Sequence, residues 1–279
     1  MIMKMRETIV GIVAVLTAAA ISLSPLKADP PPPVRQTRAQ KIAELTADLG
    51  YGADIKHVDA AIPYLAKNVA PADPTWNSTH RRWAAVCAMI KSNLRDDAEQ
   101  AFAEAEASIV ENAEHALNDG AVGGDLDGAL AFFRSNPGRH YLELQNVLTD
   151  MSIGISLDSD ADATGVSVEN LDARKRLLEL WLPVIFIRAI YPPQIADRSI
   201  EASYEKFSQL RGAQLDALAQ RYADELPQFE AFIQTASFGR IINAEKLAGQ
   251  ATPAPNLSDF FAAEARRHAS EWHAAYLAP

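Results

Sequence analysis

The spacing of apolar residues is the feature that most restricts the fold of this chain. From residue 35 onward, apolar residues recur at intervals of three and four, and alternating, strand-like segments are almost absent. In the segment 96–117, for example, the predicted inner stripe is Phe102, Ala105, Ile109, Ala113 and Ala116. Glycine and proline divide this pattern into about ten segments. The sequence therefore predicts an all-α fold, built as an array of antiparallel helical hairpins.

The helix boundaries follow from these punctuating residues and from candidate caps. The predicted helices are Arg35 to Leu49, Asp54 to Val69 with a bend near Pro63, a helix capped by Asn77 or Ser78 and ending near Asn93, Asp96 to Leu117, Leu171 to Ile190, Ser199 to Tyr222, and Ser258 to about Leu277. Residues 171–190 form the most hydrophobic of these segments. We expect a central core helix there, and the alternative is a helix that meets a membrane or a partner. Glu179 and Pro183 interrupt it, so it is too short to span a bilayer.

Two segments one hundred residues apart carry a similar turn pattern. The first is Ala-Phe-Phe-Arg-Ser-Asn-Pro-Gly-Arg at 131–139, and the second is Ala-Phe-Ile-Gln-Thr-Ala-Ser-Phe-Gly-Arg at 231–240, with one extra residue. The predicted hairpin residues are Phe132, Phe133, Ser135 and Gly138 in the first copy, and Phe232 and Gly239 in the second. We expect phenylalanine to enter the core, the hydroxyl residue to cap the turn, and glycine to let the second helix start close to the first.

This repetition suggests an internal duplication. The first helical half would be residues 35–155 and the second 171–279, with an acidic loop at 156–170 between them. One compact unit without a duplication is the alternative.

The first turn also resembles the signature of a bacterial family that is known only as a domain of unknown function. The signature is Phe-(Phe/Tyr)-x-Ser-x-x-Gly, matched here by Phe132, Phe133, Ser135 and Gly138. The second copy departs from it, because Thr235 stands where serine is usual. The motif covers about 20 residues, and the helical pattern around it about half of the chain. The resemblance implies an exported, all-helical protein, and it implies no activity.

The N-terminus has the three parts of a secretory signal peptide. Lys4 and Arg6 precede an apolar run from Ile9 to Leu23, and Ala28 offers a small residue for cleavage before Asp29. The apolar run is short compared with the roughly 20 residues of a membrane-spanning helix. We therefore predict a cleaved signal at 1–28 and a periplasmic or secreted protein. An uncleaved anchor and a cytosolic protein are the alternatives.

Removal of the predicted signal changes what remains of the chain. Three cationic residues and one anionic residue leave with it, so the formal net charge moves from −10 to −12. Residues 29–34 contain four consecutive prolines, which form an extended spacer. No segment of the mature chain is then expected to span a membrane.

The acidic balance and the cysteine content exclude several classes of protein. Nucleic-acid binding depends on Lys and Arg meeting phosphates, so we expect no nucleic-acid partner. Electrostatic docking on anionic lipid is disfavoured for the same reason. Cys87 is the only cysteine, so no intramolecular disulfide can form. It lies in an apolar stretch and is expected to be a small buried residue, with a reactive thiol as the alternative.

A twelve-residue acidic segment is the sharpest candidate for a ligand site. Acidic side chains stand at its positions 1, 3, 5 and 12, namely Asp158, Asp160, Asp162 and Glu169. This is the spacing of oxygen ligands in an EF-hand calcium loop. However, position 6 is Ala163 instead of glycine, and no second loop of this kind is present. A solvated acidic linker is the alternative, and the only cofactor suggested is Ca²⁺.

No catalytic constellation emerges from the remaining residues. His268 and His273 are five residues apart and do not share a helix face. Ser135 with His140 could serve as nucleophile and base, but Ser135 is better placed as a helix cap. The sequence therefore favours a non-enzymatic exported protein that binds another protein or an envelope component through amphipathic helices. The alternatives are a calcium-responsive protein that uses the 158–169 loop and a hydrolase with an unrecognised site.

Overall fold

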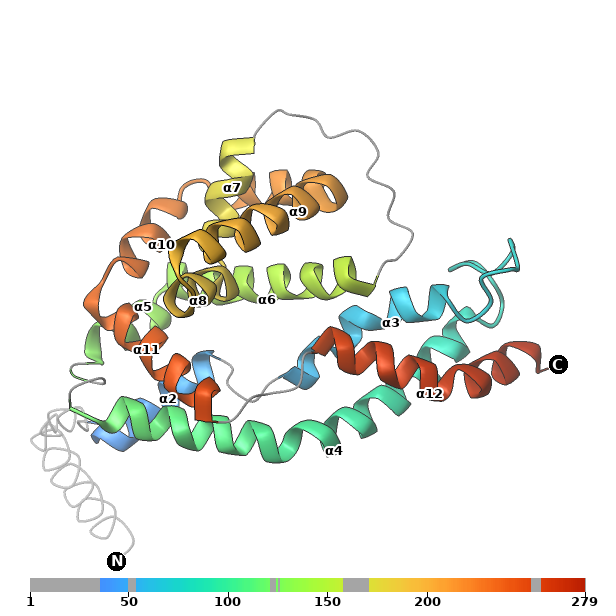
Figure 1. The fold of residues 1–279 in the computed structure, drawn as a ribbon, viewed down its shortest axis with the longest axis horizontal. Helices are drawn as coiled ribbons and strands as arrows, with labels where there is room; N and C mark the ends of the chain where they lie inside the picture. Colours follow the sequence, from blue (N-terminus) through green and yellow to red (C-terminus); the bar gives the residue numbers. More distant parts are fainter. Residues whose placement is uncertain are drawn as a thin grey trace, which may run out of the picture. The chain divides into compact units, whose positions relative to one another are not determined.

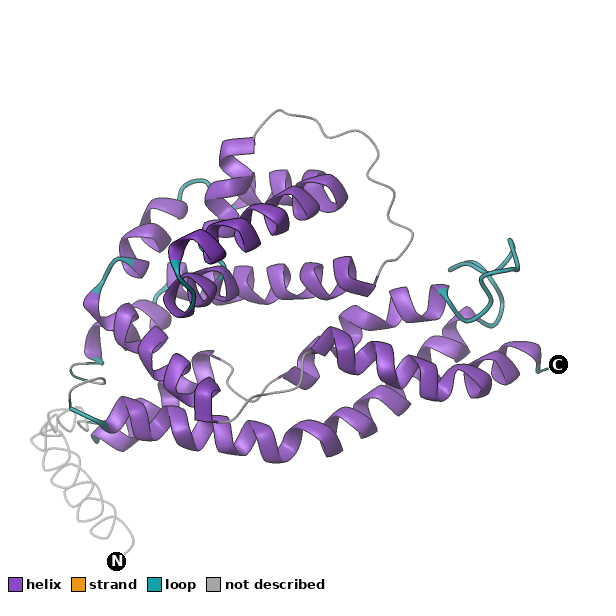
Figure 2. Cartoon of the chain, viewed as in Figure 1, coloured by secondary structure: helices purple, strands orange, loops and turns teal. Residues whose placement is uncertain are grey.

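The described secondary structure of the protein is entirely helical (Figures 1 and 2). The computed structural model describes residues 36–49, 54–120, 124, 126–157, 171–251 and 257–278. In chain order the helices are α2 (Arg38–Leu49), η1 (Asp54–His57, a 3-10 helix), α3 (Val58–Lys67), α4 (Trp83–Asn118), α5 (Asp127–Arg134), α6 (Asn136–Leu157), α7 (Leu171–Glu179), α8 (Leu182–Ile190), α9 (Pro193–Arg221), α10 (Leu226–Ile233), α11 (Ala236–Ala251) and α12 (Leu257–Leu277). The predicted all-α class is confirmed.

Residues 37–279 form one compact unit. Helix α4 packs against helices from the beginning and from the end of this unit, namely α2, α3, α11 and α12 (Figure 1). None of the described helices combines the length and the apolar character that crossing a membrane requires.

Helix α4 is continuous where the sequence suggested two helices separated near residue 95. Its buried stripe runs at intervals of four residues through Val86, Ile90, Leu94, Ala98 and Phe102, each at most 1% exposed. No glycine or proline falls between 83 and 118, so nothing in the backbone breaks the helix. The polar residues between 91 and 97 lie beside this stripe and do not interrupt it.

The start of α4 also differs from the expected cap. Asn77 Oδ1 accepts hydrogen bonds from the backbone N of Thr79 at 2.9 Å and from its hydroxyl group. Asn77 therefore closes a turn of its own, and the helix begins only at Trp83. Asparagine stabilises this type of turn as readily as it caps a helix.

Two clusters of buried side chains lie along α4. One brings together α3, the N-terminal half of α4 and α12, with Phe102, Phe261 and Trp272 among its largest members. The other gathers residues of α2 and of α5 to α11, with Tyr141, Phe229 and Phe238 among its fully buried rings. The C-terminal helix thus completes a core that begins with α3.

The prediction of a single core helix at residues 171–190 is wrong. The segment is divided into α7 and α8 at Leu180 and Trp181. Pro183 lies in the first turn of α8, and its missing N–H and its ring prevent the preceding helix from continuing. Val184 is the only buried residue of α8, whereas Phe186 and Ile190 are only partly buried.

The side chain of Gln145 on α6 forms hydrogen bonds with the backbone on both sides of the break between α7 and α8. Its amide nitrogen donates to the carbonyl oxygen of Leu180 at 2.9 Å, and its amide oxygen accepts from the backbone N of Leu182 at 2.7 Å. The hydroxyl of Tyr141 donates to the same Leu180 oxygen at 3.1 Å. Buried backbone groups that the break leaves without helical partners are thereby satisfied.

Candidate functional site

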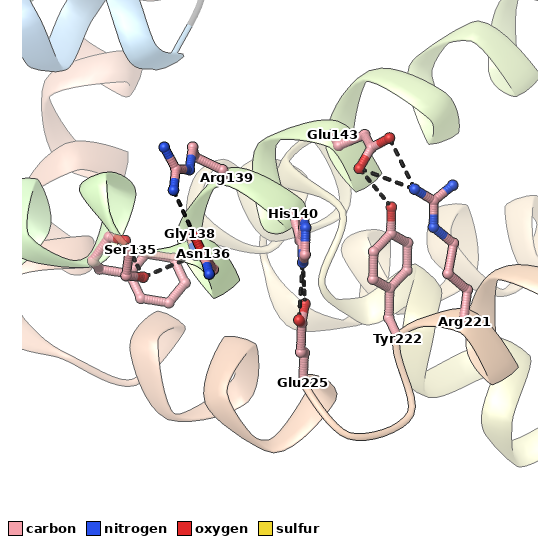
Figure 3. A network of polar contacts seen from close by, with 10 residues as sticks. Ser135, Asn136, Gly138, Arg139, His140, Glu143, Arg221, Tyr222 and Glu225 are labelled. Carbon is pink, nitrogen blue, oxygen red and sulfur yellow. Dashed lines mark hydrogen bonds and ion pairs between the residues drawn. The ribbon is translucent and has the colours of Figure 1, made fainter.

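The first predicted turn is held by the hydroxyl group of Ser135 (Figure 3). Ser135 Oγ donates to the carbonyl oxygen of Phe132 at 2.6 Å and accepts from the backbone N of Gly138 at 3.1 Å. A Cβ atom on Gly138 would lie 1.9 Å from the Phe132 oxygen. Glycine is therefore required there by the close approach of α5 to the start of α6.

The second turn has the same two hydrogen bonds as the first, but its residues align with those of the first turn differently from the predicted alignment. Thr235 Oγ1 donates to the carbonyl oxygen of Phe232 at 2.7 Å and accepts from the backbone N of Phe238 at 3.1 Å. Phe238 therefore corresponds to Gly138, with no extra residue between the copies. A Cβ atom on Gly239 would meet no atom within 4 Å, so the close-approach role that we expected for Gly239 is wrong.

The phenylalanines of the two turns pack against each other. The rings of Phe132 and Phe232 are stacked, with centroids 3.8 Å apart and an interplanar angle of 10°. Phe133 is 2% exposed and contacts Phe232 edge to face. The aromatic residues of both motifs thus form part of the core, where their contribution is to packing.

His140 is not the partner of Ser135. Its Nδ1 lies 2.9 Å from both carboxylate oxygens of Glu225, while the Ser135 hydroxyl remains within its own turn (Figure 3). Beside this pair, Glu143 accepts hydrogen bonds from Arg221 at 3.1 Å and from the Tyr222 hydroxyl at 3.2 Å. This network fastens α6 to the segment between α9 and α10 and contains no nucleophile paired with a base.

The predicted calcium ligands Asp158, Asp160, Asp162 and Glu169 lie outside the described residues. The hypothesis of a calcium loop therefore stays a prediction. The predicted signal peptide at 1–28 and the proline-rich spacer at 29–34 also lie outside them.

One buried carboxyl group titrates near neutral pH. Although part of Glu245 on α11 remains accessible to solvent, burial of its carboxyl group raises its pKa to about 7. Burial also raises the pKa of Tyr141, and the nearby Glu245 carboxylate raises it further. A carboxyl group in such surroundings prefers its neutral form.

Three potential metal ligands meet between α4 and α12. They are Asp97 from α4 and Glu264 and His268 from α12, and their ligand atoms all lie within 4.8 Å of one another. His268 Nε2 is 2.9 Å from Asp97 Oδ2 and 4.0 Å from Glu264 Oε2. The side chains are 19%, 15% and 16% exposed, respectively, so the cluster is largely shielded from water.

Spacing between histidines does not reveal this cluster. Two of its members are carboxylates, and Asp97 precedes His268 by 171 residues. The available signal was the pair Glu264 and His268, which are four residues apart and therefore share a helix face.

Charged neighbours hold the cluster in place. Arg267 pairs with Asp97, and its Nε lies 2.7 Å from Glu264 Oε2. Burial raises the pKa of Asp97, but hydrogen bonds from Arg267 and His268 outweigh it, so this pKa lies below its usual value. Burial lowers the pKa of His268, but hydrogen bonds to Glu271 and Asp97 outweigh it and raise the pKa above its usual value.

A groove of about 310 Å³ lies between α3, the end of α6 and α12. Its lining is mostly apolar and consists of Leu65, Val69, Leu157, Ala262, Ala265, Ala269 and Trp272, with Asn68, Ser156 and Arg266 as the polar members. Arg266 is exposed and makes no hydrogen bond or ion pair with any residue in the described part of the chain. The groove thus combines apolar walls with a cation at its edge.

Comparisons with models of protein families, with curated proteins and with solved structures found no match for this chain.

Proposed function

We propose that this protein is an exported binding module whose ligand site is the groove between α3, α6 and α12. The supporting observation is the composition of that groove, which offers apolar walls and the exposed Arg266 guanidinium at its edge. Its volume of about 310 Å³ is near the lower end of the range of about 300–1,000 Å³ typical of ligand sites. The space therefore suits a few apolar side chains better than a large cofactor.

The occupant that fits best is an apolar helical segment of another protein. Ala262, Ala265 and Ala269 form a row of small residues along α12, at intervals of three and four. Small side chains allow a second helix to approach closely, while Leu65 and Trp272 provide larger apolar surfaces beside it. A carboxylate on the partner segment would pair with the Arg266 guanidinium.

The predicted export signal and the resemblance to the exported helical family support the proposal of a role in the periplasm or outside the cell. The equal turns at Ser135 and Thr235 support the further proposal that the fold is an array of hairpins with two related halves. In both turns the hydroxyl group accepts a hydrogen bond from the backbone N–H three residues later, and Phe132 and Phe232 stack on each other.

Groove-filling variants test the binding proposal. The protein would be used to capture partners from a bacterial envelope extract, in parallel with Ala265→Leu and Ala269→Leu. We expect at least one partner that the wild type retains and both variants lose. Arg266→Gln should weaken its capture, whereas Arg198→Gln, a change at another exposed arginine, should not. Thermal unfolding by circular dichroism would establish that all variants are folded.

The contrary result is also well defined. If every protein captured by the wild type is captured equally by both folded filling variants, the groove is not the binding site. A photoreactive residue at position 269 gives a second measurement, because a bound partner helix would be cross-linked from there and not from position 198.

A further inference from the structure

We propose that Asp97, Glu264 and His268 form a binding site for a divalent transition metal, and that Zn²⁺ is the ion that fits best. Imidazole nitrogen and carboxylate oxygen are both zinc ligands in proteins, and three protein ligands leave a fourth position open to water or substrate. None of its three ligands lines the groove, and none belongs to the predicted calcium loop.

The distances between the ligand atoms suit a zinc ion. A tetrahedron with metal–ligand distances of about 2.1 Å has edges of about 3.4 Å. His268 Nε2 lies 2.9 Å from the Asp97 oxygen and 4.0 Å from the Glu264 oxygen, so the two separations bracket this value. Shifts of about half an ångström, within the range of side-chain rotation, would complete the geometry.

His268 is already oriented as a metal ligand. Its Nδ1 lies 2.9 Å from Glu271 Oε2 and its Nε2 lies 2.9 Å from Asp97 Oδ2, so in this arrangement the ring donates to both carboxylates. A metal ion would displace the proton on Nε2, while Nδ1 would keep its hydrogen bond to Glu271. Histidines that bind zinc usually donate their second nitrogen to a carboxylate in this way. Trp272 stacks on the imidazole at 5.8 Å and 16°, and its own indole N–H donates to Asn93 Oδ1 at 3.0 Å. The plane of the ring is therefore supported from outside the cluster.

Glu264 supplies a second, independent observation. Its Oε2 atom is buried and has no hydrogen-bond partner in the described part of the chain, although Arg267 Nε is close enough for an ion pair. Buried carboxylate oxygens normally accept hydrogen bonds or bind cations. This oxygen lies 4.0 Å from His268 Nε2, and a metal ion between the two atoms would replace its ion pair with Arg267.

Arg267 occupies the position of a competing cation. It pairs with Asp97 and lies beside Glu264, but its side chain is 55% exposed and can turn into solvent. A bound divalent ion would take over the neutralisation of the two carboxylates. The proposal therefore makes an unusual prediction: removing the arginine strengthens metal binding.

Calorimetry with zinc chloride on the full, tag-free protein tests the proposal. We expect one ion per chain. His268→Ala should weaken binding by more than about 100-fold, and Glu271→Gln by about tenfold. Arg267→Gln should strengthen it by about tenfold, because it removes a charge-assisted competitor. His273→Ala is the matched control on the same helix and should leave the affinity unchanged.

Two outcomes would overturn the proposal. One is the absence of saturable zinc binding in both the wild type and folded Arg267→Gln. The other is equal loss of affinity in His268→Ala and His273→Ala, which would indicate scattered histidine binding on the surface. Circular dichroism of each variant, with zinc-free protein as reference, separates loss of the site from loss of the fold.

Discussion

The same substitution, glycine to alanine, should have opposite effects at Gly138 and at Gly239. Both residues lie in the first turn and a half of a helix that follows a hydroxyl-capped turn. Neither has a positive φ angle, so alanine can adopt the backbone conformation at each site. Gly239 lies one position later in its helix than Gly138, and the main difference between them is the space around an added methyl group. The pair therefore tests the effect of close packing.

The magnitudes follow from the surroundings of each added Cβ atom. At Gly138 the new atom would lie 1.9 Å from the carbonyl oxygen of Phe132 and 2.7 Å from Cα of Phe133, so the backbone must move. Overpacking of this kind destabilises a protein by about 1–3 kcal/mol, and contact with rigid backbone favours the upper part of that range. At Gly239 the added methyl group meets nothing, and alanine is favoured over glycine within a helix by about 0.5–1 kcal/mol.

Thermal unfolding followed by circular dichroism measures both effects. For a unit of this size, 1 kcal/mol corresponds to roughly 2–4 °C in Tm. Gly138→Ala should therefore lower Tm by about 4–12 °C, and Gly239→Ala should raise it by about 1–4 °C. If both variants shift Tm in the same direction, or if Gly138→Ala is neutral, the close approach of α5 to α6 does not determine the residue at 138.

Four further predictions concern the core, the buried carboxyl group, the acidic loop and export. Phe232→Ala should destabilise the fold by about 3–5 kcal/mol in urea unfolding, because it removes a stacked core ring, and a loss below about 1 kcal/mol would contradict that role. Burial raises the pKa of Glu245 from about 4.5 to about 7 in the folded state, so folding favours the neutral carboxyl group. The free energy of unfolding that this preference contributes is present below about pH 4.5 and is lost as the pH rises through 7. Glu245→Gln should flatten this pH dependence in unfolding titrations, and an unchanged profile would refute the assignment. Calorimetry with calcium should give saturable heat that Asp158→Ala combined with Glu169→Ala abolishes, and an absence of heat in the wild type ends the calcium hypothesis. N-terminal sequencing of the protein from a periplasmic fraction should begin at Asp29, and an intact N-terminus would contradict cleavage.

Local sequence signals were sufficient for the helical class and for the first turn. Ser135 and Gly138 act through atoms within a few residues of them, so their roles follow from short spacing in the chain. The break between α7 and α8 was harder to predict from the sequence. Pro183 marks it, but the apolar character of the segment suggested burial, and only the contact with Gln145 shows how the two helices are joined.

Features that depend on distant segments could not be predicted in this way. The register of the second turn could not be predicted from its glycine, because Phe238 and not Gly239 occupies the position of Gly138. The metal-ligand cluster joins Asp97 to a residue 171 positions later in the chain. Sequence periodicity identifies which face of each helix is apolar, but it does not identify the helix that will cover that face.

The position of α12 explains why the two proposed sites lie together. Phe261 and Trp272 attach this helix to the core formed by α3 and the first half of α4. Trp272 lines the groove and also stacks on His268, so one buried ring borders both sites. Each site therefore requires α12 to remain packed on α4, and Trp272→Ala should impair both together. By contrast, Ala265→Leu should affect only the groove and His268→Ala only the metal site.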